Sequence, residues 1–282
     1  MWHIWIKNIN HMKKLSVASV VCAVVAGIMG GNHASAQTLA VQLQADNYNP
    51  TTGVWADSSG NGNNGTYGKV AGTTGAQVLP TLATGVTPNG SDAVSISAGN
   101  GSFLLNTSLA YSSGYTVLAY VLPTNTSGRH ALTGGSAGYA LEYDIYNGNQ
   151  DFLQEYQNDV AHGTATVPTS GFSLLDLAVA GGPGSANSFD FNSQPDASSS
   201  PGGSGAGLGS NLTRIGNNEG GGDGFVGDIA EIDIYTGVLT PTQIANDEAA
   251  INTAYAVPEP TTLALMAGGI GALVATRRMR RN

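Results

Sequence analysis

The chain has 282 residues, 40 of them glycine, and a formal net charge of −9. Seven of its ten Lys and Arg residues lie in the first 14 or the last six positions, so segment 37–256 has three basic against 18 acidic residues, a charge of −15. Such a segment repels phosphate, which argues against a nucleic-acid partner. The single cysteine, Cys22, precedes it, which excludes disulfides and thiolate chemistry there.

The first 36 residues have the parts of a secretory signal peptide. Two lysines follow Met12, which is an alternative start, and an apolar stretch then covers 15–28. A small-x-small cleavage pattern comes next, formed by Ala34 and Ala36 before Gln37. The apolar stretch is short for a membrane span. We therefore expect the mature protein to begin at Gln37.

Between residues 37 and 240, short runs alternate apolar and polar residues, with Gly, Asn and Ser between them. This pattern is typical of an all-β sandwich or barrel. The expected strands include 115–121, a hairpin over 139–156 that turns at 147–149, and two runs at 172–181 and 225–235. In the hairpin, alternation places Tyr139, Leu141, Tyr143 and Ile145 on one face.

Two later segments break the strand pattern. Residues 195–211 are a low-complexity Gly/Ser loop. Residues 240–255 are expected to form a helix, with Thr240 as its cap, Pro241 in the first turn and Ile244 with Ala245 packed inward.

Three stretches in order resemble the LamG-like (concanavalin A-like) jelly roll. They are the loop Trp55–Gly68, the strand around Tyr120, where that family usually has tryptophan, and the closing run from Leu212 to Ile244. The resemblance spans nearly all of 41–255 and implies one jelly-roll sandwich over 37–256. The middle, roughly 150–200, matches poorly.

That superfamily includes β-glucanases, which carry Glu-x-Asp-x-x-Glu, or a form one residue shorter, on one strand. Glu142-x-Asp144 and Glu231-x-Asp233 come close, but Asn147 and Thr236 stand where the last glutamate would be. Neither an amide nor a hydroxyl can protonate a leaving oxygen at neutral pH. We therefore expect these acids to lie on the solvent face of their strands, and the domain not to be an enzyme.

Oxygen ligands suitable for Ca²⁺ occur in two loops. The weak candidates are Asp57, Asn61, Asn63, Asp223 and Asp228. Because Asp and Asn serve turns more often than metal sites, we favour turns in both places. No cofactor is predicted beyond a structural Ca²⁺ at one of these loops.

Binding of sugars depends on aromatic rings and on polar groups beside them. Tyr111, Tyr146 and Tyr156 are available by alternation, although strand tyrosines more often pack in half-buried positions. His130 and His162 are isolated in the sequence and are expected at the surface.

The last 26 residues combine three features in order. Val257-Pro258-Glu259-Pro260 comes first and is held extended by its prolines. A short apolar helix within 261–276 follows, and a basic cluster ends the chain, with Arg277, Arg278, Arg280 and Arg281. The arginines favour the cytoplasmic side of a membrane.

This tail resembles the PEP-CTERM sorting signal. The resemblance implies a transmembrane helix at 261–276 before processing, and recognition by an exosortase, a membrane-embedded processing enzyme of Gram-negative bacteria that often accompanies exopolysaccharide.

These features predict an exported protein of the cell envelope or outer surface of a Gram-negative bacterium. Its expected role is structural or adhesive and non-enzymatic, with an exosortase as processing partner and polysaccharide or other surface proteins as contacts. Two alternatives remain open, a Ca²⁺-dependent carbohydrate-binding module and a divergent glycoside hydrolase.

Overall fold

The computed structural model describes residues 37–256, with gaps at 71–75, 100, 111–113, 137–141, 154–159, 181–186, 197–210 and 219. The chain divides into two units, Met1–Ala36 and Gln37–Asn282, and every described residue belongs to the second. The predicted signal peptide, sorting signal and membrane helix lie outside the described residues. Within the described part of the chain, no helix is long and apolar enough to cross a bilayer.

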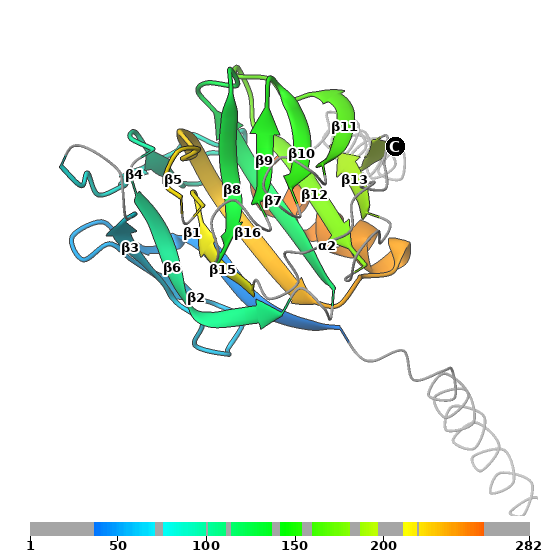
Figure 1. Cartoon of the computed structure of the whole chain (residues 1–282), viewed down its shortest axis with the longest axis horizontal. Helices are drawn as coiled ribbons and strands as arrows, with labels where there is room; N and C mark the ends of the chain where they lie inside the picture. The colour runs from blue at the N-terminus through cyan, green and yellow to red at the C-terminus, as the bar shows by residue number, and fades with distance from the viewer. Residues whose placement is uncertain are drawn as a thin grey trace, which may run out of the picture. The chain divides into compact units, whose positions relative to one another are not determined.

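The strands form a β-sandwich and follow one continuous hydrogen-bonded order, β11-β10-β9-β8-β15-β6-β3-β2-β1-β16-β7-β12-β13-β14 (Figure 1). We call the strands from β11 to β3 the first layer and those from β1 to β14 the second layer, and β2 (Val54–Asp57) joins them. The first layer contains β3 (Gly65–Lys69), β6 (Gly101–Ala110), β8 (Arg129–Gly135), β9 (Glu142–Tyr146), β10 (Asn149–Leu153), β11 (Val160–Thr166) and β15 (Asn211–Ile215). The second contains β1 (Thr38–Asn49), β7 (Tyr115–Pro123), β12 (Ser173–Val179), β13 (Asn187–Phe191), β14 (Gln194–Asp196) and β16 (Gly227–Thr236). A short pair, β4 (Thr81–Ala83) and β5 (Ala93–Ile96), is attached to β16.

The main core lies between the two layers. The ring of Tyr115 in β7 meets that of Phe152 in β10 with centroids 6.2 Å apart, and Tyr143 in β9 meets Phe189 in β13 at 6.2 Å. Burying such aromatic pairs supplies much of the hydrophobic stabilisation of a sandwich. The prediction that Tyr143 and Ile145 face the core is confirmed; Tyr139 and Leu141 lie outside the described residues.

The predicted hairpin is present as β9 and β10. Asn147 and Gly148 form its two-residue turn, with φ angles of 48° and 89°. Two consecutive positive φ angles are the requirement of a type I′ turn, which glycine meets without strain and asparagine tolerates. The turn sets the register that decides which side chains of these strands face outward.

The loop that opens the LamG-like pattern is anchored by a buried aromatic residue. Trp55 has no exposed surface, and its Nε1 donates a hydrogen bond to the carbonyl of Gln44 at 2.7 Å. Its ring lies edge-on to Phe103 at 5.0 Å. The tryptophan of this motif is therefore a core residue and not part of a surface site.

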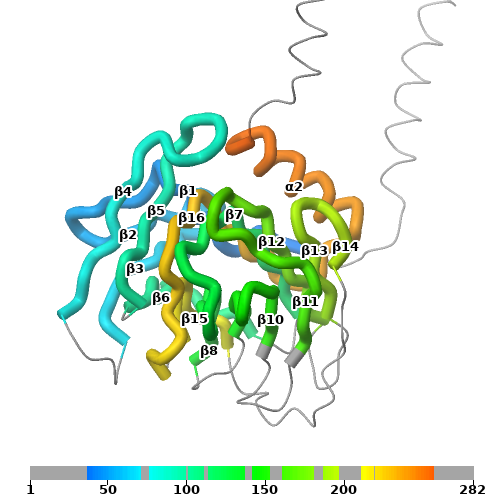
Figure 2. The backbone as a smooth tube through the Cα atoms, turned by 90° about the horizontal axis from the view of Figure 1, so that it is seen from above, coloured from blue at the N-terminus to red at the C-terminus, as the bar shows by residue number. Residues whose placement is uncertain are grey.

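Helix α2 (Pro241–Tyr255) packs on the outer face of the second layer (Figure 2). Ile244, Ile251 and Tyr255 are buried there in a second hydrophobic cluster. Tyr120 of β7 stacks on Tyr255 with centroids 5.6 Å apart. The predicted helix and the inward position of Ile244 are confirmed, but Ala245 is exposed, because the helix buries positions 244, 248, 251 and 255 instead.

Candidate functional site

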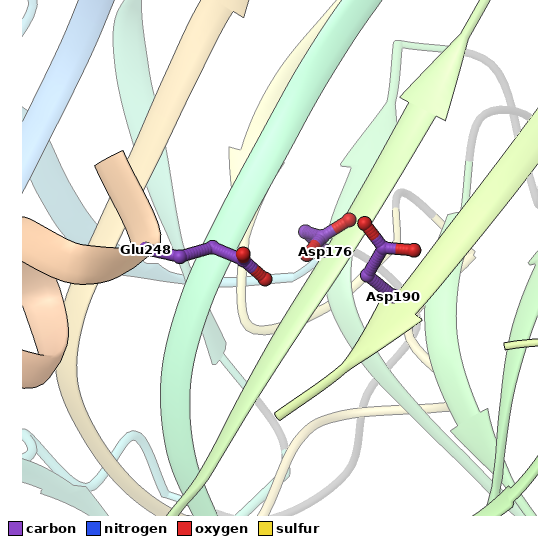
Figure 3. Close-up of side chains that lie close together, drawn as sticks. All are labelled: Asp176, Asp190 and Glu248. Carbon is purple, nitrogen blue, oxygen red and sulfur yellow. The ribbon is translucent and has the colours of Figure 1, made fainter. Parts of the chain in front are cut away.

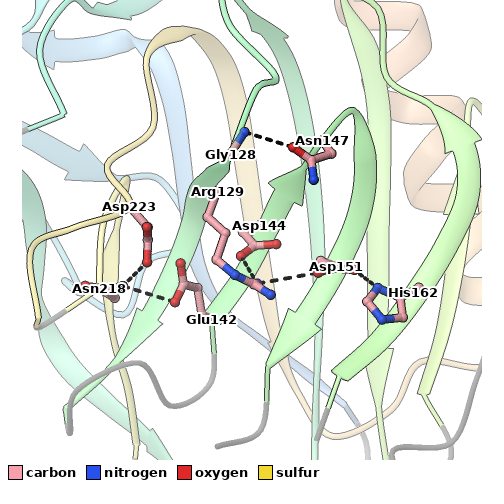
Figure 4. Close-up of polar contacts among 9 residues, drawn as sticks. All are labelled: Gly128, Arg129, Glu142, Asp144, Asn147, Asp151, His162, Asn218 and Asp223. Atoms are coloured by element: carbon pink, nitrogen blue, oxygen red, sulfur yellow. Dashed lines mark hydrogen bonds and ion pairs between the residues drawn. The ribbon is translucent and has the colours of Figure 1, made fainter. Parts of the chain in front are cut away.

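Strand register gathers charged and aromatic side chains on the outer face of the first layer. Arg129 of β8 lies opposite Tyr146 of β9, Asp144 of β9 lies opposite Asp151 of β10, and Asp151 also lies opposite His162 of β11. Paired residues share a face and residues two apart on one strand do as well. All five side chains therefore point away from the core, and Figure 4 shows four of them, those of Arg129, Asp144, Asp151 and His162.

Arg129 holds this group together. Its Nη1 lies 2.6 Å from Oδ2 of Asp144 and 3.4 Å from Oδ2 of Asp151. Its guanidinium carbon lies 4.4 Å from the centre of the Tyr146 ring, a cation–π contact. On the far side of Asp151, Nδ1 of His162 contacts Oδ1 of the carboxyl. These contacts fix the positions of the neighbouring side chains relative to one another.

The group has an accessible level and a buried one. Tyr146 is 37% exposed, and the side chains of Arg129 and His162 are 20% and 56% exposed. We call these three residues the polar strip. The carboxyls of Asp144 and Asp151 beneath them are buried. A solvent-accessible ring and nitrogen donors are thus held in place from below by carboxylates.

Burial strongly affects the acids under the polar strip. It raises the pKa of Asp144 well above its usual range, an effect that the neighbouring Glu142 increases and Arg129 opposes. Burial also raises the pKa of Asp151, against the opposing influence of His162 and Arg129. Arg129 itself stays charged: burial works against its charge, but Asp144 and Asp151 raise its pKa.

Glu142 lies at the end of the same face and is fully buried. Its Oε2 accepts a hydrogen bond from Nδ2 of Asn218 at 3.0 Å, and the same amide donates to Asp223 at 3.1 Å. Oε1 of Glu142 is buried without a hydrogen-bond partner. Burial raises the pKa of Glu142 to about 8, with a hydrogen bond from Asn218 opposing and the charge of Asp223 adding to the shift.

The position of the missing glucanase glutamate is part of the hairpin turn. Asn147 accepts a hydrogen bond on Oδ1 from the backbone of Gly128 at 3.1 Å. Its side chain thus ties two loops together. An amide at this position cannot protonate a leaving oxygen at neutral pH.

The second Glu-x-Asp pair lies beneath α2. Glu231 and Asp233 of β16 are 2% and 4% exposed and border a cleft of ≈ 280 Å³ between β1, β16 and the helix. The amides of Gln42 and Gln44 both donate to Oε1 of Glu231, at 2.9 and 3.1 Å. The prediction of solvent-facing acids is wrong for both Glu-x-Asp pairs. Alternation does send them away from the core, but α2 covers one pair and the surroundings of Arg129 and Asn218 bury the other.

The first predicted Ca²⁺ loop has the geometry of a turn. The Asp57 carboxylate accepts hydrogen bonds from the backbone of Gln42, Ser59 and Asn63 at 2.8–2.9 Å. The side chains of Asn61 and Asn63 donate to backbone carbonyls of β1, each with a contact at 2.7 Å. Burial acts to raise the pKa of Asp57, but these backbone hydrogen bonds lower it below the usual value.

The two Ca²⁺ candidates of the second loop, Asp223 and Asp228, have different surroundings. Asp223 accepts from Asn218, whereas Asp228 lies on β16 opposite Leu122 of β7. Binding of Ca²⁺ at either loop remains a prediction.

The remaining predicted residues differ in outcome. Tyr146 is exposed as a sugar-stacking ring must be, while Tyr111 and Tyr156 lie outside the described residues. His162 is at the surface but is paired with Asp151, and His130 is buried, with Nε2 at 3.1 Å from the carbonyl of Ser127. Arg129 was not predicted. Its signal in the sequence is its rarity, since only three basic residues occur in 37–256.

A two-layer β-sandwich with an exposed aromatic ring among polar groups on one face is the architecture of lectin-like domains. The sequence matches the concanavalin A-like lectin/glucanases superfamily over residues 88–245, more than half of the chain, and the chain belongs to that superfamily. Residues 256–281 match the PEP-CTERM protein-sorting motif, which indicates an exported protein sorted to the cell surface. The opening loop at Trp55 lies before the superfamily match.

Solved structures have the same fold at low sequence identity. Domain 4 of AbnA, an extracellular arabinanase of Geobacillus stearothermophilus solved with arabinotriose, has a TM-score of 0.51 and 21% identity, over 74% of this chain and 98% of that one. The binding domain of botulinum neurotoxin serotype D has a TM-score of 0.50 and 12% identity, over 76% of this chain and 51% of that one. Trypanosoma rangeli sialidase in complex with sialic acid has a TM-score of 0.49 and 16% identity, over 73% of this chain and 32% of the sialidase. Comparison with curated protein sequences gave no match.

Proposed function

We propose that this protein is a non-catalytic carbohydrate-binding protein of the cell surface, whose adhesive or structural role depends on contact with extracellular polysaccharide. The observation that carries the proposal is the polar strip of Arg129, Tyr146 and His162, accessible above the buried carboxyls of Asp144 and Asp151.

The chemistry of the polar strip suits a sugar. The apolar face of a pyranose or furanose ring packs on an aromatic side chain, and its hydroxyls need donors and acceptors nearby. Tyr146 offers the ring, and Arg129 and His162 offer nitrogen donors on adjacent strands. Their contacts with Asp144 and Asp151 hold both side chains in place before a ligand arrives, which lowers the entropy lost on binding.

The buried carboxyls support binding over hydrolysis. Retaining glycosidases need two carboxyl groups about 5 Å apart that reach the glycosidic bond from either side. Glu142 and Asp144 have no exposed surface, and Asp144 is occupied by Arg129. Glycoside hydrolysis remains a second candidate for one reason: burial raises the pKa of Glu142 to about 8, the property of a general acid.

The class of ligand is inferred from the surface and from the sorting motif. The arabinanase domain was solved with arabinotriose, but a shared fold does not fix a ligand. The PEP-CTERM motif supports processing by an exosortase at the envelope, and exopolysaccharide is the carbohydrate that we propose the protein meets there. We infer a neutral or anionic polysaccharide chain, since the polar strip combines the aromatic ring of Tyr146 with the cationic guanidinium of Arg129.

Calorimetric titration of the purified full-length protein with oligosaccharides from the host's own exopolysaccharide tests this function. We expect Tyr146→Ala to weaken binding about tenfold, the loss of roughly 1.4 kcal/mol of stacking. Leu104→Ala is the matched control, because Leu104 is 49% exposed on the same layer but lies on β6.

Two results would contradict the proposal. One is equal affinity of the parent and Tyr146→Ala. The other is release of reducing sugar by the parent that Glu142→Gln abolishes, which would make the protein a hydrolase.

A further inference from the structure

Three carboxylates converge beneath α2, outside both loops that the sequence suggested for Ca²⁺. Asp176 of β12 and Asp190 of β13 are direct cross-strand partners, and Glu248 reaches them from the helix. They lie on the outer face of the second layer, since the neighbouring Leu175, Leu177 and Phe189 face the core. Figure 3 shows the three carboxyl groups pointing toward one another.

The charges in this cluster have no protein counter-charge on the elements that form it. Asp176 is 2% exposed and Glu248 is 4% exposed. Oδ2 of Asp176 and Oε1 of Glu248 are both buried without a hydrogen-bond partner. No Lys, Arg or His occurs on β12, β13 or α2. Burying carboxylates in this way is costly unless a cation or shared protons compensate.

The geometry of the cluster suits a hard divalent cation. One oxygen from each carboxyl lies within 4.8 Å of the others. Ca²⁺ binds oxygen at about 2.3–2.6 Å, so oxygens on opposite sides of one ion are up to about 5 Å apart, whereas Mg²⁺ needs about 4 Å. Three carboxylates can supply up to six oxygens when bidentate. The absence of His and Cys from the cluster disfavours Zn²⁺.

We propose that Asp176, Asp190 and Glu248 bind one divalent cation, with Ca²⁺ the best-fitting ion, and that this ion fastens α2 to β12 and β13. The turn after β13 supports this position, because Asn252 of α2 donates to Ser193 of that turn at 3.4 Å. A calcium ion here would stabilise the fold without touching the polar strip, which lies on the other layer.

The competing explanation is that the carboxyls share protons and bind no metal. Without a bound ion, burial and the charges of Asp190 and Glu248 raise the pKa of Asp176 to about 9. Asp176 would then hold a proton at neutral pH. The two explanations differ in what added Ca²⁺ does to stability.

Thermal unfolding of the purified full-length protein, first stripped with EDTA, separates the two explanations at pH 7.5. With a dissociation constant in the 10⁻⁴–10⁻³ M range of extracellular calcium modules, 5 mM CaCl₂ should raise the Tm by about 3–8 °C. The same concentration of MgCl₂ should raise it less. Calorimetric titration with CaCl₂ should give one ion per chain at this site.

The variants are chosen to keep the fold. Asp176→Asn and Glu248→Gln preserve shape and relieve repulsion, so both should fold and lose the Ca²⁺ response. Glu231→Gln, a buried acid under the same helix but outside the cluster, should retain it.

The proposal is overturned if Ca²⁺ leaves the Tm of the parent unchanged, or if Asp176→Asn keeps the full shift. Loss of the shift in Asp228→Asn, with retention in Asp176→Asn, would also overturn it and place the ion at a loop suggested by the sequence.

Discussion

At the scale of single residues, two carboxylic acids have pKa shifts of opposite sign because their hydrogen bonds differ. Asp57 is partly buried but accepts three backbone N–H groups, so its charged form is favoured. Glu142 is fully buried with one amide donor, and its charged form is disfavoured. The sequence distinguishes these two acids poorly, because it shows the residue type but not the number of donors around it.

The first prediction concerns Asp57. Asp57→Ala would leave the N–H groups of Gln42, Ser59 and Asn63 without this acceptor, and each unsatisfied group costs about 1–3 kcal/mol unless water replaces the carboxylate. We expect a loss of about 3 kcal/mol in the free energy of unfolding, measured with urea. Asp228→Ala, at a half-buried position on β16, should cost less than about 1 kcal/mol. Equal losses in the two variants would refute a structural role for the Asp57 loop.

The second prediction concerns Glu142 and pH. Its pKa is raised to about 8 in the folded protein, so the folded state holds a proton that the unfolded chain releases above its ordinary pKa near 4.3. This contribution to stability is complete below about pH 4 and is lost as the pH rises to 8. In EDTA, the Tm should therefore fall between pH 5 and pH 9, and Glu142→Gln should fall less steeply. A Tm that rises over this range would contradict the assignment.

At the scale of elements, helix α2 is held by its cap and by its buried side. The capping box is complete: Oγ1 of Thr240 accepts from the backbone of Gln243 at 3.3 Å, and Oε1 of Gln243 accepts from the backbone of Thr240 at 2.9 Å. Beneath the helix, Tyr120 stacks between Phe172 and Tyr255, with centroids 5.2 and 5.6 Å away. Tyr120, where the family usually has tryptophan, therefore packs against the helix through Tyr255.

The third prediction tests the cap. Thr240→Ala should lower the free energy of unfolding by about 1 kcal/mol, because the backbone N–H of Gln243 in the first turn loses its acceptor, Oγ1 of Thr240. Thr253→Ala, an exposed position on the same helix, should change it by less than about 0.5 kcal/mol. If urea denaturation gives the two variants the same midpoint, the cap does not matter for stability.

Much of the order of strands and helix could be predicted from the sequence. Which elements and side chains cover the outer face of each layer could not. Alternation in 142–146 correctly placed Tyr143 and Ile145 in the core, and Thr240-Pro241 correctly marked the start of α2. Alternation also sent Glu231 outward, but only the tertiary fold lays α2 over it. Likewise Arg129 and Asp144 are 15 residues apart, and their ion pair depends on the register of β8 with β9.

At the scale of the whole molecule, acidic and basic residues lie in different parts of the chain. Segment 37–256 carries −15 and has three basic residues, of which Arg129 supports the candidate site. The basic residues of the sorting motif lie at the end of the chain.

The fourth prediction separates the parts of the tail. If the processing enzyme recognises Pro258-Glu259-Pro260, as we propose, replacing these residues with three alanines should leave the protein exported but retained in the membrane at full length. Changing Arg277, Arg278, Arg280 and Arg281 to serine should instead disturb orientation. Fractionation of the native host with a tag near Ser199 measures both. Normal surface release of the alanine variant would rule out sorting by this motif.

The central claim is that the polar strip binds polysaccharide at the cell surface. Its most direct test is co-sedimentation of the purified full-length protein with the host's own exopolysaccharide, comparing the parent, Tyr146→Ala and Leu104→Ala. The account predicts that the parent and Leu104→Ala sediment with the polysaccharide, with half-saturation shifted about tenfold higher for Tyr146→Ala. Sedimentation of all three proteins at the same concentration, or of none, would contradict it.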